Sequence, residues 1–76
     1  MKKEEHLKEK LANILEIKKS DIDTKYPIND SILDSLSVLS LMAAIDEIYG
    51  VSISGTEIVN SGDFFSLQAI IEERSS

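Results

Sequence analysis

The chain has 76 residues, no cysteine and a formal net charge of −6, which together indicate one small domain, residues 1–76, without a disulfide framework. Most of the negative charge lies in residues 26–76, where eight acidic residues accompany only Arg74, and this acidity argues against a nucleic-acid partner because phosphates would be repelled. No apolar run approaches the roughly 20 residues that cross a bilayer, and the charged segment 2–6 is unlike a signal peptide, so we expect a cytoplasmic monomer without membrane insertion.

The first predicted element is a helix over about residues 4–17. Its apolar residues recur at helical spacing, with lysine and glutamate between them: Leu7, Leu11, Ile14 and Leu15. Lys18 and Lys19 follow at its C-terminal end, where positive charges are stabilising next to the negative end of the helix dipole. We expect the apolar stripe of this helix to face the core.

Residues 18–33 form a long connection that contains the only proline. Pro27 biases Tyr26 away from helical geometry, and a single capped turn is expected near the start of the connection. We expect Tyr26, Ile28 and Ile32 to pack onto the core and to order this segment.

The second predicted helix spans residues 35–49, with Asp34 as the N-cap and Gly50 just after its end. At about 100° per residue, six apolar side chains cover about 120° of arc, the width of a core-facing stripe: Val38, Leu41, Met42, Ile45, Ile48 and Tyr49. The opposite side carries a second set, Leu36, Leu39 and Ala43, alongside the acidic residues Asp46 and Glu47.

A helix of a small bundle cannot bury two sides in its own core, so Leu36, Leu39 and Ala43 are expected to form an exposed apolar strip. An apolar strip with acidic neighbours suits the surface of a protein partner. Two alternatives stay open. Single exposed leucines are ordinary on protein surfaces, and a long connection folded over part of the strip would cover it.

Two further helices complete the prediction. Residues 54–57 match a capping box before a short helix over about 55–60. After a turn, Ser61 or Asp63 caps a last helix over about 64–74, and its inward residues are Phe64, Leu67, Ile70 and Ile71. Met42 and the pair Phe64 and Phe65 are expected to fill the core. The predicted fold is all-α: a small antiparallel bundle of three principal helices plus one short helix.

Ser35 is the candidate site. It lies at the start of the second helix, where unpaired backbone N–H groups and the positive end of the helix dipole favour an anionic phosphate. Capping alone also predicts Asp and Ser at this place. No catalytic or metal site is expected, because His6 is the only histidine and Asp21 and Asp23 do not match a calcium-binding loop.

In these features the sequence resembles the acyl carrier protein family. The resemblance rests on Asp34-Ser35-Leu36 at the start of the second helix of an acidic chain of about this size, and it includes the order of the helices. It continues at Leu41, Ala44, Ile45, Asp46-Glu47, Tyr49-Gly50, Ile53 and Glu57.

The resemblance implies that a phosphopantetheinyl transferase moves 4′-phosphopantetheine from coenzyme A onto the Ser35 hydroxyl, with Asp34 taking part in recognition of the transferase. It implies a carrier, not an enzyme: the thiol of the arm holds acyl groups as thioesters for fatty acid or related acyl and polyketide biosynthesis. The implied partners are a loading ligase and acyl-processing enzymes, which contact Leu36, Leu39, Ala43, Asp46 and Glu47, and long acyl chains would retreat between the helices.

Two departures from the family pattern affect the expected partners. Ser37 and Ser40 stand where fatty-acid carriers usually have acidic residues, which predicts weaker docking to basic patches. Ser31-Ile32-Leu33 precedes the motif and looks more like stand-alone carriers of specialised pathways, including D-alanyl and other aminoacyl carriers. An aminoacyl carrier and an unmodified helical interaction module therefore remain as alternatives.

Overall fold

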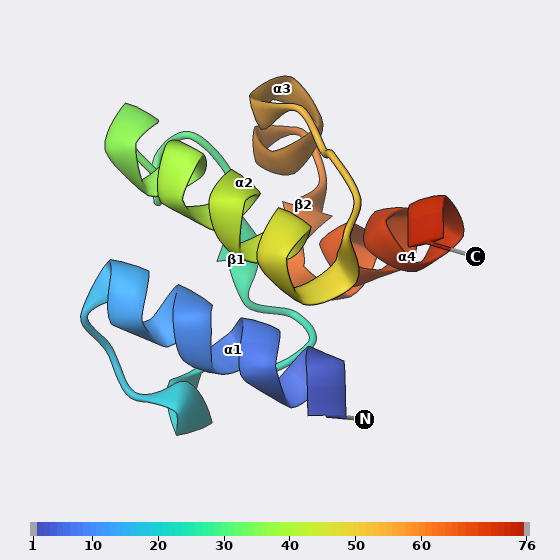
Figure 1. Cartoon of the computed structure of the whole chain (residues 1–76). Helices are drawn as coiled ribbons and strands as arrows, with labels where there is room; N and C mark the ends of the chain where they lie inside the picture. Colours follow the sequence, from blue (N-terminus) through green and yellow to red (C-terminus); the bar gives the residue numbers. More distant parts are fainter. Residues whose placement is uncertain (1, 76) are drawn as a thin grey trace.

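The computed structural model describes residues 2–75, which form four α-helices, one short 3₁₀ turn and a minimal two-stranded sheet. In chain order these are α1 (Lys2–Leu15), η1 (Lys19–Asp21), β1 (Pro27–Ile28), α2 (Ser35–Tyr49), α3 (Gly55–Val59), β2 (Gly62–Asp63) and α4 (Phe64–Ser75). Figure 1 shows α1 and α2 side by side, with α4 at the other side of the molecule from the start of α2. The predicted all-α fold is confirmed.

The ends of the helices follow from local chemistry. The Asp34 carboxylate accepts a hydrogen bond from the Ser37 N–H at 2.8 Å and caps α2, as predicted. Gly50 ends α2 at φ 72°, a left-handed conformation that glycine adopts without steric cost. α1 instead ends at Leu15, two residues before its predicted end, because Glu16 takes φ 60° and the Ile17 N–H bonds back to the Ala12 carbonyl.

The last two helices are capped by side chains. Ser54 and Glu57 form both bonds of the predicted capping box at the start of α3. Of the two candidate caps for α4, the structure uses Asp63, whose carboxylate accepts from the Ser66 N–H at 2.8 Å. The Ser61 hydroxyl donates instead to the Ile58 carbonyl, so it closes the end of α3.

The long connection is ordered by a bridge that the sequence did not predict. β1 pairs antiparallel with β2 in the register Pro27 to Asp63 and Ile28 to Gly62. The Phe64 N–H continues this contact by donating to the Tyr26 carbonyl at 2.9 Å. Extended backbone in both segments lets them satisfy each other's polar groups, which a hydropathy pattern does not reveal.

The core lies between α1, α2, α4 and the connection. Its fully buried side chains include Leu7, Leu11, Ile28, Leu41, Ile45, Ile58, Phe64, Leu67 and Ile71. Tyr26 and Met42 are partly buried against it, as expected. Two expectations are wrong: Ile32 is 37% exposed while its neighbour Leu33 is buried, and Phe65 is 64% exposed.

The reasons for these two differences are local. A bend at Asn29, whose carbonyl and side chain accept the backbone N–H groups that follow, turns Leu33 inward and Ile32 outward. Phe64 already fills the inward position of the first turn of α4. The next residue in a helix is rotated by about 100°, so Phe65 points away from the core.

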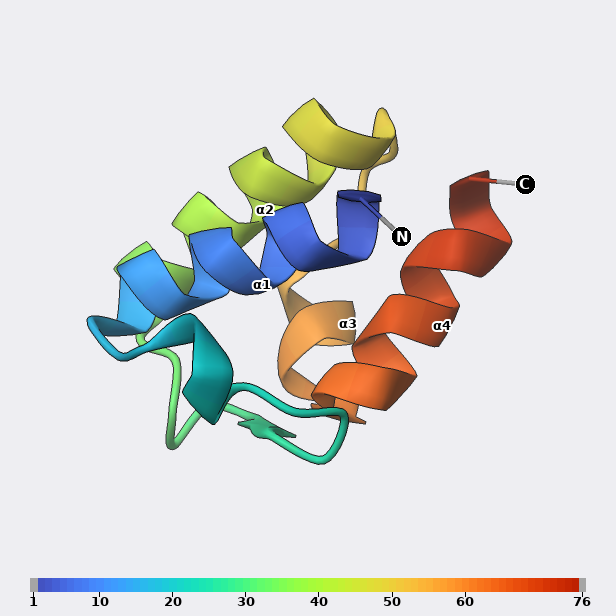
Figure 2. The ribbon, with the colours of Figure 1, turned by 90° about the horizontal axis from the view of Figure 1, so that it is seen from below.

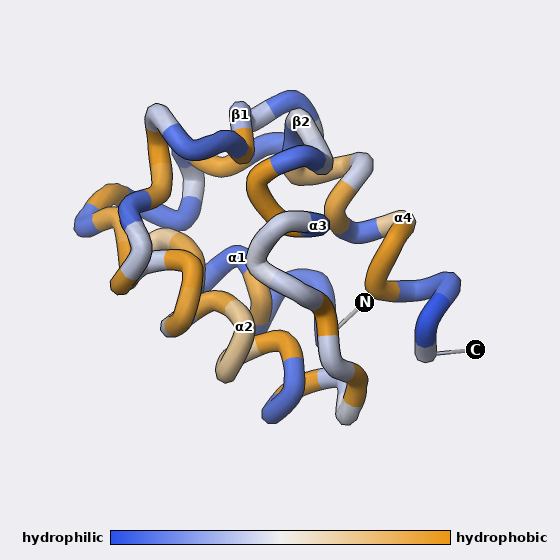
Figure 3. The backbone as a smooth tube through the Cα atoms, turned by 90° about the horizontal axis from the view of Figure 1, so that it is seen from above, coloured by the Kyte–Doolittle hydropathy of each residue, from blue (hydrophilic) through white to orange (hydrophobic). Residues whose placement is uncertain are grey.

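Hydropathy is distributed unevenly along the backbone. Figure 3 shows that α2 is hydrophobic over most of its length, with hydrophilic residues near its end. No helix within residues 2–75 combines the length and the apolar character needed to cross a membrane.

Candidate functional site

Ser35 is the first residue of α2, and its side chain is exposed. Its hydroxyl forms no hydrogen bond with any residue that the structure describes, whereas the Ser54 hydroxyl at the start of α3 is committed to the Glu57 N–H. A free hydroxyl at the positive end of a 15-residue helix is sterically accessible and is electrostatically compatible with a phosphodiester.

Asp34 is adjacent and also exposed. The pKa of its carboxyl is lowered, first by the hydrogen bond from the Ser37 backbone N–H and then by the Ser37 side chain. Asp34 is therefore ionised at neutral pH. The structure gives it a capping role, and its charge lies directly before the candidate attachment residue.

An apolar groove begins at Ser35 and runs between α2 and α3. Its volume is about 480 Å³, and its lining is mainly apolar: Asp30, Leu33, Asp34, Ser35, Val38, Leu39, Met42, Gly55, Thr56 and Val59. This volume is within the range of small-molecule sites, about 300–1,000 Å³. The groove therefore has room for an apolar group attached next to Ser35.

The α3 side of this groove was missed by the sequence analysis. Gly55 lies against α2 so closely that a Cβ there would be 3.0 Å from Cγ1 of Val38 and 3.8 Å from Sδ of Met42. Gly55 opens α3 directly after the Ser54 cap, and this is the one signal that could have indicated a close approach. Which helix it approaches depends on tertiary packing.

The predicted apolar strip is exposed. Leu36 is 72% exposed, Leu39 is 61% exposed and Ala43 lies in the same open surface. Ile32, which was expected in the core, adds a fourth exposed apolar side chain close to the start of α2. The connection does not bury the two leucines, so this alternative from the sequence analysis is wrong.

The two acidic residues of the candidate partner surface differ in their surroundings. Asp46 lines a second hollow of about 270 Å³ together with Leu39, Met42, Ala43, Ser52 and Ile53. Glu47 lies toward α1, where its carboxylate is 4.0 Å from the Lys10 ammonium. The structure therefore joins Asp46 to the apolar strip and places Glu47 at its border with α1.

The remaining candidates stay apart from this site. His6, Asp21 and Asp23 are exposed on α1, η1 and the connection. Within residues 2–75, no group of three or more histidine, aspartate or glutamate side chains is arranged to hold a metal ion.

Comparison with known proteins bears on the same residues. The family model for the phosphopantetheine attachment site matches residues 5–68, which include all of α2 and α3, most of α1 and the start of α4. Neither the curated proteins nor the solved structures gave a match. The matched range covers most of the chain, and the free serine, the helix terminus and the adjacent groove suit such a group. The chain therefore belongs to the family of carrier proteins with a phosphopantetheine attachment site, whose cofactor is covalently attached 4′-phosphopantetheine.

Proposed function

We propose that Ser35 is the attachment residue and that the chain is an acyl carrier protein of fatty acid or related acyl biosynthesis. When bound, the group supplies a terminal thiol that holds acyl cargo as a thioester. The observation that supports Ser35 most strongly is its free, exposed hydroxyl at the start of α2, beside a groove of about 480 Å³.

The residues around Ser35 have separate roles in this proposal. Asp34 holds the first turn of α2 in place and presents a negative charge to the modifying transferase. Val38 and Met42 line the groove on the α2 side, so that an acyl group near Ser35 can be buried against apolar side chains, away from water. Leu36, Leu39, Ala43, Asp46 and Glu47 form the surface where the processing enzymes dock.

The chain contributes no catalytic group in this proposal. A serine nucleophile of an enzyme needs a base within hydrogen-bond reach, and the Ser35 hydroxyl has no such contact with the described residues. The proteins that act on this carrier supply that chemistry themselves.

The attachment residue is tested by incubating the purified protein with coenzyme A and a broad-specificity phosphopantetheinyl transferase, followed by intact mass measurement. We expect a gain of one phosphopantetheine group. Ser35→Ala should abolish the gain, whereas Ser31→Ala and Ser37→Ala should keep it. A gain that persists in Ser35→Ala would place the attachment elsewhere.

Two variants separate the capping role of Asp34 from the role of its negative charge. Asp34→Asn keeps an oxygen that can cap α2 but removes the charge, and Asp34→Ala removes both. If the transferase reads the charge, the modification rate falls in both variants. If it needs only an ordered helix start, the rate falls mainly in Asp34→Ala.

Cargo is tested by loading acyl groups of increasing length and measuring thioester hydrolysis. A fatty-acyl carrier should protect longer chains, because the groove covers them. Val59→Phe narrows the groove and should reduce this protection, while Leu36→Phe adds the same ring outside the groove and should not.

A D-alanyl or other aminoacyl carrier is the second candidate. Ser37 and Ser40 leave the first half of α2 without acidic side chains after its cap, which is unlike a carrier that docks on basic patches. Equal hydrolysis rates for short and long acyl chains would favour this candidate.

An unmodified interaction module is the third candidate, and the exposure of Leu36 and Leu39 supports it. It requires partner binding that survives Ser35→Ala without any transferase treatment. Leu39→Asp should then abolish the binding, because it places a charge in the apolar strip.

A further inference from the structure

A separate hollow lies on the side of the molecule formed by the start of α1, the connection and α4. Its volume is about 320 Å³, and its lining residues are Glu4, Thr24, Phe65, Gln68, Ala69 and Glu72. Figures 1 and 2 show the N-terminal end of α1 beside α4, while the start of α2 lies at the opposite side. None of these lining residues belongs to the Ser35 groove or the apolar strip.

Phe65 forms the aromatic wall of this hollow. Phe65 is 64% exposed, so its side chain is accessible to a ligand in the hollow. Phe65, Ala69 and Glu72 recur at helical spacing on α4, so they present one continuous surface. The Phe65 N–H donates to the Thr24 carbonyl at 2.8 Å, which fixes the backbone beneath the ring.

Two carboxylates, those of Glu4 and Glu72, line the same hollow as Phe65. Burial is the first cause that raises the pKa of Tyr49, and the charges of Glu72 and Glu4 raise it further, against the lowering effect of its hydrogen bond with Gln68. Among the side chains of residues 3–75, neither carboxylate forms an ion pair. The nearby Lys3 ammonium lies 5.7 Å from the centre of the Tyr49 ring instead.

Gln68 lies beneath this surface and is only 7% exposed. Its Nε2 donates to the Tyr49 hydroxyl at 2.6 Å and to the Glu72 carboxylate at 3.1 Å. Its Oε1 is buried without a partner. The Gln68 amide thereby holds the Glu72 carboxylate at the edge of the hollow, and a buried acceptor without a partner costs free energy that a new donor would recover.

We propose that this hollow binds an arginine side chain presented by a partner protein. The aliphatic part of arginine would lie on Phe65 and Ala69, while its planar guanidinium reaches Glu4 and Glu72. An aromatic face beside carboxylates suits a guanidinium better than an ammonium, because the guanidinium stacks on rings and is less strongly hydrated. Anionic ligands are excluded by the same two carboxylates.

The charge of the chain favours a different protein over a second copy. Arg74 is the only arginine of the sequence, and its guanidinium is already held by Glu57. A second copy would have to break this contact to supply an arginine. A basic partner has no such cost and is attracted by the net charge of −6.

The test uses the full chain with uniform ¹⁵N labelling, with and without the phosphopantetheine group, at low ionic strength. The probe is an acetylated and amidated tripeptide, glycine–arginine–glycine, and its matched control replaces arginine with the neutral isostere citrulline. We expect amide shifts at residues 65, 69 and 72 with the arginine peptide. The citrulline peptide should bind about tenfold more weakly or not at all.

Variants locate the binding. Phe65→Ala and Glu72→Gln should each weaken binding of the arginine peptide, and Glu9→Gln, which changes an acidic residue of α1 outside the hollow, should not. Circular dichroism of each variant shows whether the helices are retained. The amide shifts should be equal in the modified and unmodified protein, because the hollow does not include Ser35.

A second control peptide, acetylated and amidated glycine–lysine–glycine, carries the same charge as an ammonium. Four outcomes would overturn the proposal: no shifts at these residues, equal binding of the citrulline peptide, equal or tighter binding of the lysine peptide, or shifts that change on dilution without peptide. The third would indicate a general cation site, and the fourth would indicate a second copy of this chain.

Discussion

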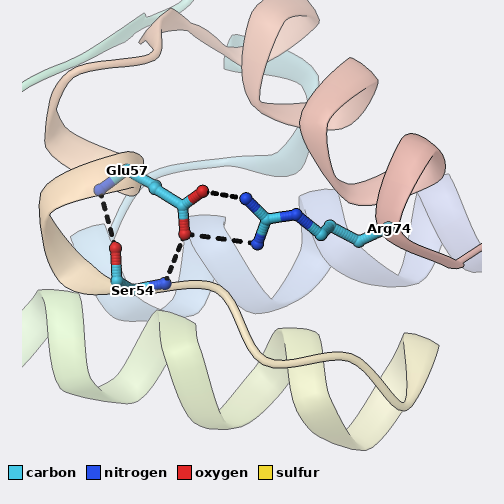
Figure 4. Close-up of polar contacts among 3 residues, drawn as sticks. All are labelled: Ser54, Glu57 and Arg74. Atoms are coloured by element: carbon cyan, nitrogen blue, oxygen red, sulfur yellow. Dashed lines mark hydrogen bonds and ion pairs between the residues drawn. The ribbon is translucent and has the colours of Figure 1, made fainter.

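Arg74, near the end of α4, holds Glu57 of α3 through both of its terminal nitrogens (Figure 4). One of these hydrogen bonds joins Nη1 to Oε1 at 3.3 Å. The same Glu57 side chain accepts the Ser54 N–H at 3.0 Å, so a single carboxylate closes the capping box and ties α3 to α4. Since α3 forms one side of the groove beside Ser35, this pair fixes that side.

The Glu57 contacts predict a pH dependence of stability. They lower the pKa of Glu57 from 4.5 to about 2, with Arg74 as the first cause and the Ser54 backbone as the second. A carboxyl with a depressed pKa in the folded state stabilises the fold above its unfolded pKa. This stabilisation should be lost as the pH falls from about 4.5 to about 2.

The check is thermal unfolding between pH 7 and pH 2 for wild type and Arg74→Gln. We expect a lower Tm for Arg74→Gln at pH 7 and convergence of the two proteins toward pH 2. Both side chains are partly exposed, at 46% and 33%, so solvent screening makes the difference modest. Lys10→Gln, which breaks an exposed pair at 4.0 Å, is the matched control and should leave the profile unchanged.

Truncating a side chain on one side of α2 should lower stability strongly, whereas truncating one on the other side should hardly change it. Leu41 is fully buried and Leu39 is 61% exposed, although they are two residues apart. Leu41→Ala should lower the free energy of unfolding by about 2–5 kcal/mol, because it leaves a cavity in the core. Leu39→Ala should change it by no more than about 0.5 kcal/mol.

Urea denaturation measures this difference. Leu39→Ala is the matched control, because it makes the same leucine-to-alanine change at an exposed position. A small domain has little stability to lose, so Leu41→Ala should unfold at clearly lower urea concentration. Equal losses in both variants would contradict the assignment of the two sides.

A side chain added at Gly50 should lower stability through backbone conformation alone, without a steric clash. The Gly50 φ of 72° is left-handed, yet apart from Gly50 and its neighbours along the chain no atom lies within 4 Å of the position that a Cβ would take. Gly50→Ala should therefore destabilise the fold by about 1 kcal/mol through backbone strain alone. Gly50→Asn should cost less, because asparagine tolerates this conformation.

Glu16 is the reverse case, a non-glycine residue in a left-handed conformation. It takes φ 60° at the end of α1, where glycine is favoured. Glu16→Gly should remove the strain, partly offset by the greater freedom of glycine in the unfolded chain. The expected result is a Tm at or above that of wild type, measured under the same conditions as Gly50→Ala, and a clear loss of stability would contradict it.

Local signals determined the helices and their caps. Asp34, Gly50 and the capping box of Ser54 and Glu57 act within a few residues of the chain, so their geometry follows from the sequence alone. The exposed strip on α2 was also predictable, because helical periodicity places Leu36 and Leu39 opposite the core stripe. The candidate attachment residue lies in the same region, but its proposed role came from the resemblance of Asp34-Ser35-Leu36 to the family motif, because capping alone also explains Asp and Ser at a helix start.

Only the tertiary structure decided what surrounds these elements. The contact of Arg74 with Glu57 joins residues 17 positions apart, and the pairing of β1 with β2 joins residues up to 36 positions apart. The exposure of Phe65 depends on such long-range packing. Periodicity identifies the apolar sides of a helix but not the neighbour that each side meets. For this reason the sequence could predict the serine and its helix, whereas the groove between α2 and α3 and the hollow beside Phe65 required the packed chain.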